Sequence, residues 1–176
     1  MRIFQSDKEK RIAEGIRKGS HTAMKELYDE WSGYLFALCL RYVPDRETAG
    51  DILQDSLVKI FSNAGSFSYK GPGSLKAWIS RIAVNEALQY LRKKKGGEMI
   101  EYKDSLPDIV SEEPEEADIG KIPANVLQKM IEELPEGYRT IFNLFVFEEM
   151  SHKEIAAALG ISESTSASQF HRARKL

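Results

Sequence analysis

The sequence is poor in the residues that build metal centres and covalent cross-links. It holds a single cysteine, Cys39, inside the apolar stretch LFALCLRYV, so an internal disulfide or a zinc–cysteine cluster is excluded. The three histidines are far apart, and neither Asp51 nor Asp55 has the histidine that accompanies such carboxylates in metal-binding bundles. No glycine-rich phosphate loop and no nucleophile motif is found. We therefore interpret Cys39 as a packing residue and expect no metal, no cofactor and no enzymatic activity.

Long apolar runs are also missing. No stretch approaches the roughly 20 consecutive apolar residues that cross a bilayer, and the first residues, MRIFQSDKEKR, lack the apolar segment of a secretory signal. The 176 residues are 42% hydrophobic and 30% charged, which suits one or two compact domains. We expect a cytoplasmic protein that does not insert into a membrane.

The charges are unevenly distributed along the chain. Residues 1–95 contain 17 Lys and Arg against 11 Asp and Glu, whereas residues 96–122 contain 2 against 9. Residues 123–176 are nearly balanced, with 6 against 7. Such asymmetry indicates contact with a polyanion in the basic part and repulsion or mimicry of a polyanion in the acidic part. The net charge of −2 therefore does not exclude nucleic acid as a partner.

Apolar residues recur at spacings of three and four along most of the chain, which predicts amphipathic helices. Residues 96–122 show no sustained period, contain two prolines and hold the acidic excess, so we interpret them as a flexible linker. No strand pattern of any length is found. The predicted fold is all-α, with two small helical domains, residues 1–95 and 123–176, joined by this acidic linker.

Two helices of the first domain show the pattern clearly. Between residues 23 and 43 the apolar side chains share one face, which we interpret as core: Met24, Leu27, Tyr28, Trp31, Leu35, Leu38, Cys39 and Tyr42. Asp45 can cap the helix that follows. That helix places its polar residues opposite its apolar side: Asp51, Gln54, Asp55 and Lys59. Taken alone, this outer face is interpreted as a solvated surface.

A third helix follows the loop SNAGSFSYKGPG, has Ser74 as its predicted cap and runs to about residue 95. An arc of roughly 80° on this helix holds an aromatic ring, guanidinium groups and amides: Trp78, Arg81, Asn85, Gln89 and Arg92. The helix ends in a run of cations that includes Lys93. This combination suits single-stranded nucleic acid, where bases stack on aromatic rings and cations follow the backbone. The alternatives are Trp78 as part of the core and the cations as a solvated helix end.

The stretch SHKE and the later Gly160 are typical of a capped helix that ends in a tight turn. A second helix from residue 163 gives the spacing of a helix-turn-helix. Ser162 can cap this helix, and short polar side chains suited to phosphates and base edges follow: Ser164, Thr165, Ser168 and Gln169. Its end carries residues that can hold a DNA backbone: His171, Arg172 and Arg174. The alternative is an ordinary surface helix with a cationic C-terminus.

These parts, in this order, resemble the extracytoplasmic-function sigma factors, the two-domain subunits that give bacterial RNA polymerase its promoter specificity. The resemblance rests on three stretches: AMKELYDEWSGYLFALCLRYVPDRETAGDILQDSLVKIF, LKAWISRIAVNEALQYLRKKK and LPEGYRTIFNLFVFEEMSHKEIAAALGISESTSASQFHRARKL. It implies a protein that binds core RNA polymerase, recognises promoter DNA and melts it. An anti-sigma factor is a further implied partner.

The resemblance also implies a role for each surface. Docking on the coiled coil of the polymerase's largest subunit is implied for Asp51, Gln54, Asp55 and Lys59. The loop of residues 63–73 would hold a flipped base, and the melted minus-ten strand would lie near Trp78, Arg81, Asn85, Gln89, Arg92 and Lys93. The minus-thirty-five element would be read by Ser162, Ser164, Thr165, Ser168, Gln169, His171, Arg172 and Arg174. The acidic linker would thread toward the polymerase active-site channel.

Two positions depart from the family pattern. Ser164 stands where the family often has glycine, and Ala167 stands where a lysine or arginine is common. One phosphate contact is therefore expected to be missing from the minus-thirty-five reader. Two other functions stay open at this point: a stand-alone helix-turn-helix regulator that dimerises on operator DNA, and an adaptor whose acidic linker binds a partner.

Overall fold

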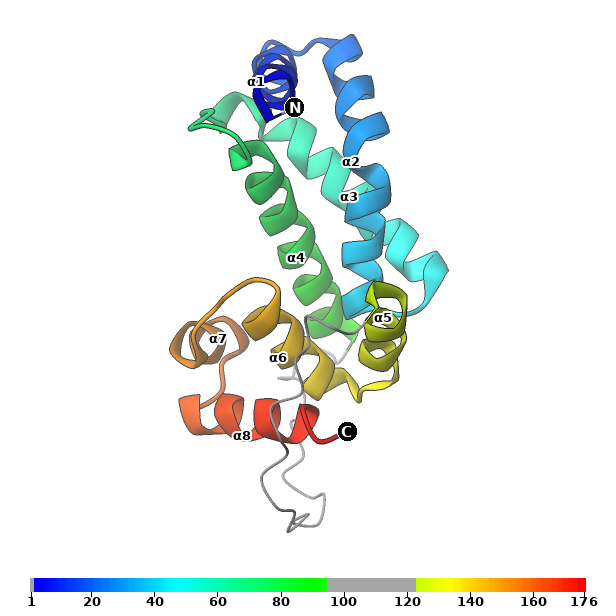
Figure 1. The fold of residues 1–176 in the computed structure, drawn as a ribbon, viewed down its shortest axis with the longest axis vertical. Coiled ribbons are helices and arrows are strands. Elements are labelled where there is room, and N and C mark those ends of the chain that lie inside the picture. Colours follow the sequence, from blue (N-terminus) through cyan, green and yellow to red (C-terminus); the bar gives the residue numbers. More distant parts are fainter. Residues whose placement is uncertain (1, 95–122) are drawn as a thin grey trace. The chain divides into compact units, whose positions relative to one another are not determined.

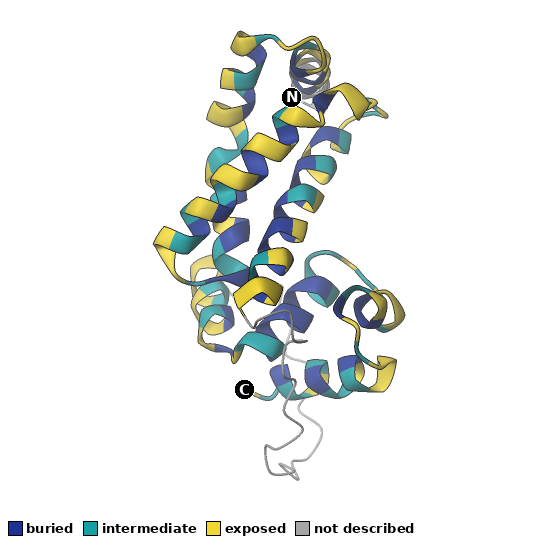
Figure 2. Cartoon of the chain, turned by 180° about the vertical axis from the view of Figure 1, so that it is seen from behind, coloured by how far each residue is buried: buried dark blue, intermediate teal, exposed yellow. Residues whose placement is uncertain are grey.

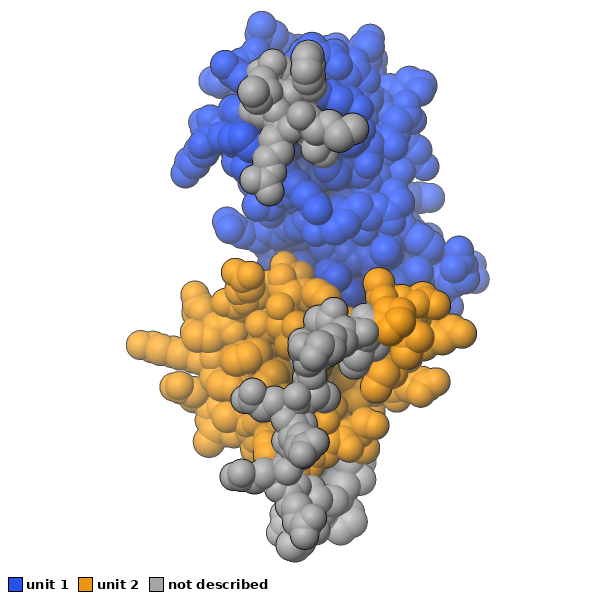
Figure 3. Space-filling model, viewed as in Figure 1, with its two compact units in different colours: residues 1–90 blue, residues 91–176 orange. Residues whose placement is uncertain are grey.

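All regular secondary structure in the described parts of the chain is helical (Figure 1). The computed structural model describes residues 2–94 and 123–176. The chain divides into two compact units, Met1–Tyr90 and Leu91–Leu176 (Figure 3). The predicted all-α fold class is confirmed, whereas the predicted linker of residues 96–122 lies outside the described residues.

The helices of the first unit begin where local capping groups are available. They are α1 (Arg2–Arg17), α2 (His21–Tyr42), α3 (Arg46–Ser62), the short 3₁₀ helix η1 (Ala64–Ser66) and α4 (Ser74–Lys94), which continues past the unit's end. The Ser20 hydroxyl accepts a hydrogen bond from the Ala23 N–H at 3.4 Å and so caps α2. Asp45 caps α3 as predicted, because its carboxylate accepts from the Thr48 N–H at 3.2 Å.

The core of the first unit is formed by buried residues from all four of its α-helices. Figure 2 colours the ribbon dark blue at buried residues. The fully buried large members of the core are Ile12, Ile16, Leu27, Leu35, Leu38, Tyr42, Ile60, Leu75 and Ile79. The predicted core face of α2 is wrong for Tyr28, which is 49% exposed, and Met24 and Trp31 are only half-buried. The neighbouring helices cover a narrower arc of α2 than its apolar stripe, so side chains at the margin of the stripe remain in contact with water.

A glycine lets α1 and α2 approach each other closely. A Cβ atom added to Gly15 would lie only 2.4 Å from the Cβ of Ala23, which is closer than two non-bonded carbon atoms can approach. The missing side chain at Gly15 and the small one at Ala23 therefore set the distance between the two helices. This contact brings the apolar side of α1 against the core.

The second unit contains four short helices after residue 122. They are α5 (Ala124–Glu133), α6 (Glu136–Val146), α7 (His152–Leu159) and α8 (Glu163–Ala173). Pro123 and Pro135 directly precede α5 and α6, where the fixed φ of proline suits a helix start. A core cluster of Ile131, Leu134, Tyr138, Phe142 and Ala173 joins α8 to α5 and α6, and further apolar residues pack against it: Leu127, Val146, Phe147 and Phe170.

Arg139 is a buried cation at the junction of α5 and α6. Its side chain is 8% exposed, and its Nη1 donates hydrogen bonds to the carbonyl oxygens of Glu132 at 3.1 Å and Leu134 at 2.7 Å. These carbonyls end α5, where a positive charge complements the helix dipole. Burial lowers the pKa of Arg139, while the nearby carboxylates of Glu136 and Glu132 act to raise it. The guanidinium therefore fixes the turn between α5 and α6.

Cys39 is a free, buried cysteine, as the sequence predicts. Burial raises the pKa of its thiol to about 12 from an ordinary value of 9.0. In the part of the chain that the structure describes, no group of three or more His, Cys, Asp or Glu is placed to hold a metal ion. Within the same residues, no helix combines the length and the apolar character needed to cross a bilayer.

The burial of Cys39 predicts that its thiol resists alkylation in the native protein. At pH 9.0 a solvated cysteine is half ionised, whereas the raised pKa keeps the Cys39 thiol neutral. Iodoacetamide is expected to label the chain only after guanidinium chloride unfolds it, which mass spectrometry measures. Because the pKa of the Cys39 thiol is higher in the folded than in the unfolded chain, the free energy of unfolding is also expected to fall as the pH rises from 9.0 toward about 12. Rapid labelling of the native chain would contradict this account.

Candidate nucleic-acid and partner interfaces

The outer face of α3 carries exposed carboxylates around an apolar side chain. Asp51, Gln54 and Asp55 are all exposed, and they form what we call the acidic face of α3. Val58 is 64% exposed, and at 100° per residue it lies between Gln54 and Asp51 around the helix. Val58 is not among the residues predicted from the sequence, although its place in the helical period is readable. The face therefore offers both charge and an apolar contact to a partner.

Lys59 lies at the margin of this face and contacts α4. Its ammonium group forms an ion pair with Glu86, a residue that is only 9% exposed. It also donates a longer hydrogen bond of 3.4 Å to Oε1 of Gln89. Much of the charge of Lys59 is thus neutralised inside the unit, and the side chain ties α3 to α4. Its predicted part in polymerase binding stays a prediction, but the structure gives Lys59 a role in packing as well.

Helix α4 presents a polar stripe on the side away from its buried residues. The predicted minus-ten residues on this stripe are all exposed: Arg81, Asn85, Gln89, Arg92 and Lys93. Trp78 is half-buried, and its ring packs against that of Phe67 with 4.8 Å between the centroids and 34° between the planes. Part of the Trp78 ring therefore anchors the loop before α4, which limits the surface left for a nucleic-acid base.

The loop of residues 63–73 is held at its end by two side chains. Ser74 is predicted to cap α4 but is instead the first residue of that helix. The Ser74 hydroxyl donates a hydrogen bond to the Gly71 carbonyl at 2.7 Å and accepts one from the Lys70 N–H at 3.2 Å. The capping acceptor is Glu9 of α1, which accepts from the N–H groups of Gly73 and Leu75. No local signal in the sequence indicates this contact, because 64 and 66 residues separate the partners.

The helix-turn-helix of the second unit has the local geometry that the sequence predicts. Ser151 and Glu154 form a reciprocal capping box at the start of α7. The hydrogen bonds from the Ser151 hydroxyl and N–H lower the pKa of the Glu154 carboxyl. Gly160 ends α7 in the left-handed region, with φ 69°, and Ser162 caps α8 by accepting from the Thr165 N–H at 3.0 Å. These caps set the turn between α7 and α8.

The exposed stripe of α8 coincides only in part with the predicted DNA-binding residues. Ser164, Ala167, His171 and Arg174 are exposed and follow one another at spacings of three and four. Gln169 is fully buried, so its predicted contact with DNA is wrong: its amide faces the interior of the unit. The remaining predicted residues are partly covered or serve the cap, and they are Ser162, Thr165, Ser168 and Arg172.

Polar and aromatic contacts fix the inner side of α8 to α7. The His152 Nδ1 and the Ser166 hydroxyl lie 3.0 Å apart within hydrogen-bonding distance, and Ser166 is fully buried. The His152 ring stacks on Phe145, with 4.6 Å between the centroids and 20° between the planes. Phe170 packs against the same pair of rings. These contacts, which orient the exposed stripe of α8, are not predicted from the sequence.

Both units match protein families of known kind. Residues 27–96, which include most of α2 and all of α3 and α4, match the family Sigma-70 region 2. Residues 124–176, which include the helix-turn-helix, match the family Sigma-70, region 4. Two helical units with these matches in this order define the class of RNA polymerase sigma factors.

Relatives over nearly the full length refine this class. The ECF RNA polymerase sigma factor SigW of Bacillus subtilis is 29% identical over 94% of this chain and 92% of its own length. The sigma factor SigV of the same organism is 30% identical over 80% of both chains, and the sigma-H factor of Pseudomonas aeruginosa is 27% identical over 98% of this chain and 93% of its own. The chain belongs to the extracytoplasmic-function family of RNA polymerase sigma factors and acts in the initiation of transcription.

Two solved structures resemble the fold. One is CnrH in complex with the cytosolic domain of CnrY, with 20% identity, a TM-score of 0.49 and coverage of 96% of this chain and 94% of that chain. The other is the sigma factor RpoE in complex with the anti-sigma factor NepR from Bartonella quintana, with 26% identity, a TM-score of 0.49 and coverage of 86% and 91%. In each of these two structures the matched chain is bound to another protein.

The left-handed turn between α7 and α8 predicts a substitution effect of known sign. Gly160→Ala is expected to destabilise the second unit by about 1–2 kcal/mol, because a Cβ atom is disfavoured at positive φ. Gly33→Ala in α2 is the matched control: a Cβ there meets no atom within 4 Å, and alanine is expected to stabilise a helix interior by about 0.5–1 kcal/mol. Urea unfolding followed by circular dichroism measures both. Equal stability of Gly160→Ala and the wild type would show that the turn does not need a glycine.

Proposed function

We propose that the chain binds core RNA polymerase through the acidic face of α3, opens the minus-ten region with α4 and the loop of residues 63–73, and holds the upstream duplex with α8. The observation that carries this proposal is the pairing of a Sigma-70 region 2 match on the first unit with a region 4 match on the helix-turn-helix. Each surface is a side of a helix that the core leaves exposed. The polymerase supplies the nucleotidyl-transfer chemistry, so the chain itself is not an enzyme, and it works in the cytoplasm.

Electrostatics supports the assignment of the α3 face. Asp51 and Asp55 are exposed, and neither carboxylate forms an ion pair with a side chain described in residues 8–94. Unpaired carboxylates attract a basic surface at long range and raise the rate of association. Val58 adds an apolar contact that can be buried when the partner docks. An attraction of this kind weakens as salt increases.

The arrangement of α4 supports a role in strand opening. Arg81 and Arg92 are exposed cations on one stripe with the amide of Asn85 between them, which suits the backbone and bases of a single strand. A base leaves the duplex only at a cost of a few kcal/mol, so it must be captured by an ordered site. The loop of residues 63–73, anchored through Phe67 on Trp78, is the site that we assign to the captured base.

The α8 stripe supports duplex binding of modest strength. Small side chains at Ser164 and Ala167 let the helix approach base edges and thymine methyl groups, and the cation Arg174 comes only at the end of the helix. One unit bound alone would be weak, but two units on one polymerase act together through their effective concentration. An anti-sigma factor is the regulatory partner that the family resemblance implies. The stand-alone dimeric regulator is not favoured, because residues 27–96 match Sigma-70 region 2.

We expect core RNA polymerase and this chain to co-elute on a sizing column without DNA. Asp51→Ala with Asp55→Ala is expected to weaken this complex about tenfold or more, because two charged contacts are lost. Glu14→Ala with Asp29→Ala, which removes two exposed acids from α1 and α2, is the matched control and is expected to bind like the wild type. A folded wild-type chain that fails to co-elute would contradict polymerase binding.

A second prediction separates DNA opening from polymerase binding. Arg81→Ala with Arg92→Ala is expected to abolish open-complex formation, measured by permanganate reactivity of unpaired thymines, because the two cations face the melted strand. Co-elution with core polymerase is expected to stay unchanged. Arg17→Ala with Lys25→Ala removes two exposed cations from α1 and α2 and serves as the control. Loss of both activities together would argue against separate surfaces on α3 and α4.

A further inference from the structure

One carboxylate joins α1 to the beginning of α4. Glu9 Oε2 accepts a hydrogen bond from the Gly73 N–H, and Glu9 Oε1 accepts one from the Leu75 N–H, both at 2.8 Å. Glu9 is 8% exposed, so both bonds are largely shielded from water. The first N–H groups of a helix have no acceptor within the helix, and a negative charge at this end is favoured by the helix dipole. Both oxygens of Glu9 are thus used to hold the start of α4.

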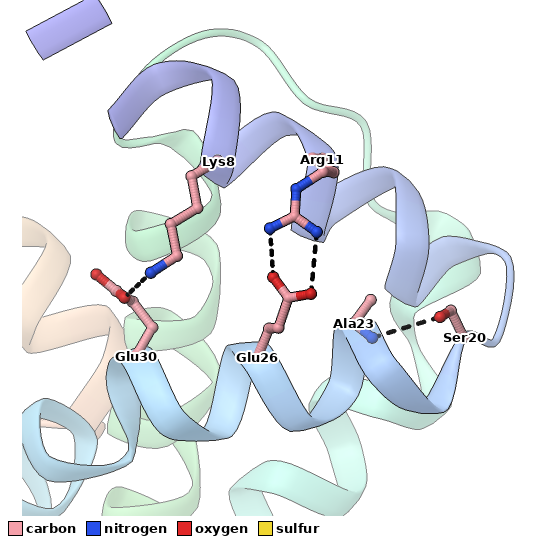
Figure 4. A network of polar contacts seen from close by, with 6 residues as sticks. All are labelled: Lys8, Arg11, Ser20, Ala23, Glu26 and Glu30. Carbon is pink, nitrogen blue, oxygen red and sulfur yellow. Dashed lines mark hydrogen bonds and ion pairs between the residues drawn. The ribbon is translucent and has the colours of Figure 1, made fainter. Parts of the chain in front are cut away.

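Helix α1 is a firm support for this contact because it is attached to α2. Arg11 forms two parallel hydrogen bonds with the carboxylate of Glu26, at 2.9 and 2.5 Å, and Lys8 forms an ion pair with Glu30 (Figure 4). Between these cations along the sequence lies Glu9, which points into the unit instead. The helix therefore binds α2 with one set of side chains and α4 with another.

The segment that Glu9 holds is the one proposed to receive the melted strand. Gly71 and Gly73 have φ values of 130° and 84°, a backbone conformation that a glycine adopts readily and other residues rarely do. Without an outside anchor, such a glycine-rich segment samples many conformations. Glu9 fixes its last residue, and the contact of Phe67 with Trp78 fixes its middle. The loop is thereby ordered before any ligand binds.

We infer that Glu9 is a positioning residue for promoter opening, which acts through the Gly73 and Leu75 amides to hold the loop of residues 63–73 and the first turns of α4 in the arrangement that captures an extruded base. The inference rests on the proposed function of α4. An ordered site binds more tightly because little conformational freedom is lost on binding. The match to Sigma-70 region 2 begins at residue 27, so it does not include Glu9.

The test compares promoter opening on two templates by the holoenzyme, assembled from core RNA polymerase and the full chain. The first template is a duplex promoter, selected from random DNA by transcription with the wild-type holoenzyme. The second is the same promoter with a mismatched, already open minus-ten region. Glu9→Gln retains one acceptor oxygen and places an amide against an N–H donor, so it breaks at least one of the two bonds.

On the duplex promoter, Glu9→Gln is expected to slow opening about tenfold or more, which corresponds to the loss of one hydrogen bond to a charged group. On the open template the activity of Glu9→Gln is expected to stay close to that of the wild type. The minus-ten bases are already unpaired there, so capture of a base no longer has to offset the cost of unstacking it. Glu14→Gln, the same substitution at an exposed position of α1, is the matched control and is expected to behave like the wild type on both. Faster hydrogen exchange at the Gly73 and Leu75 amides of free Glu9→Gln protein would establish the lost anchor independently.

Each other outcome overturns the inference in a recognisable way. Equal opening of the duplex by Glu9→Gln and the wild type would show that the anchor is not needed. Equal losses on both templates, or loss of polymerase binding, would show a purely structural role. If Glu9→Gln does not fold, Glu9→Asp keeps the charge but is too short to reach both amides, and normal opening by that variant overturns the inference as well. A wild-type holoenzyme that opens no promoter would overturn the proposed function itself.

Discussion

The burial of one side of α4 is the constraint on which the first unit depends. Leu75, Ile79 and Ala83 are fully buried, and removal of such apolar surface from water, worth about 25 cal/mol per Å², is the main attraction that holds the helix in place. The helix cannot rotate about its axis without exposing this strip. Its polar stripe therefore points in one fixed direction, and a hydrogen bond of 3.0 Å between Tyr34 and Ser80 sets its position along α2. The burial of one side of α4 thus fixes which residues its exposed side can present to a partner.

The features that sequence reasoning predicts well are those decided by near neighbours. Asp45 and Ser162 cap their helices by binding an N–H three residues further on, so the pattern of residues is sufficient to find them. Gly160 is similar, because the need for a left-handed residue arises within the turn itself. Helical periodicity likewise reflects contacts between successive turns of one helix. The all-α class, the helix-turn-helix and the acidic face of α3 are all readable for this reason.

The features that it misses are decided between helices. Tyr28 belongs to the apolar stripe of α2 by its spacing, yet nothing packs over it fully, and it stays 49% exposed. The Gln169 amide is chemically suited to hydrogen-bond a base edge, yet this residue is buried in the second unit. Lys59 and Glu9 find their partners 27 and at least 64 residues away. A residue at the margin of a helical stripe can be buried or exposed, and only the packing of the other helices decides which.

In α8 the contacts that hold the helix and the positions proposed to meet DNA lie on opposite sides. Ser166 and Ala173 belong to the interior, whereas Ser164, Ala167 and His171 are exposed. Changes at these outer positions cost the fold little, so they are open to rapid evolutionary drift and to deliberate redesign. Chains with the same fold can thus diverge until each binds its own DNA sites and not those of the others. A cell with many such factors can keep its gene programmes separate by exchanging a few surface residues.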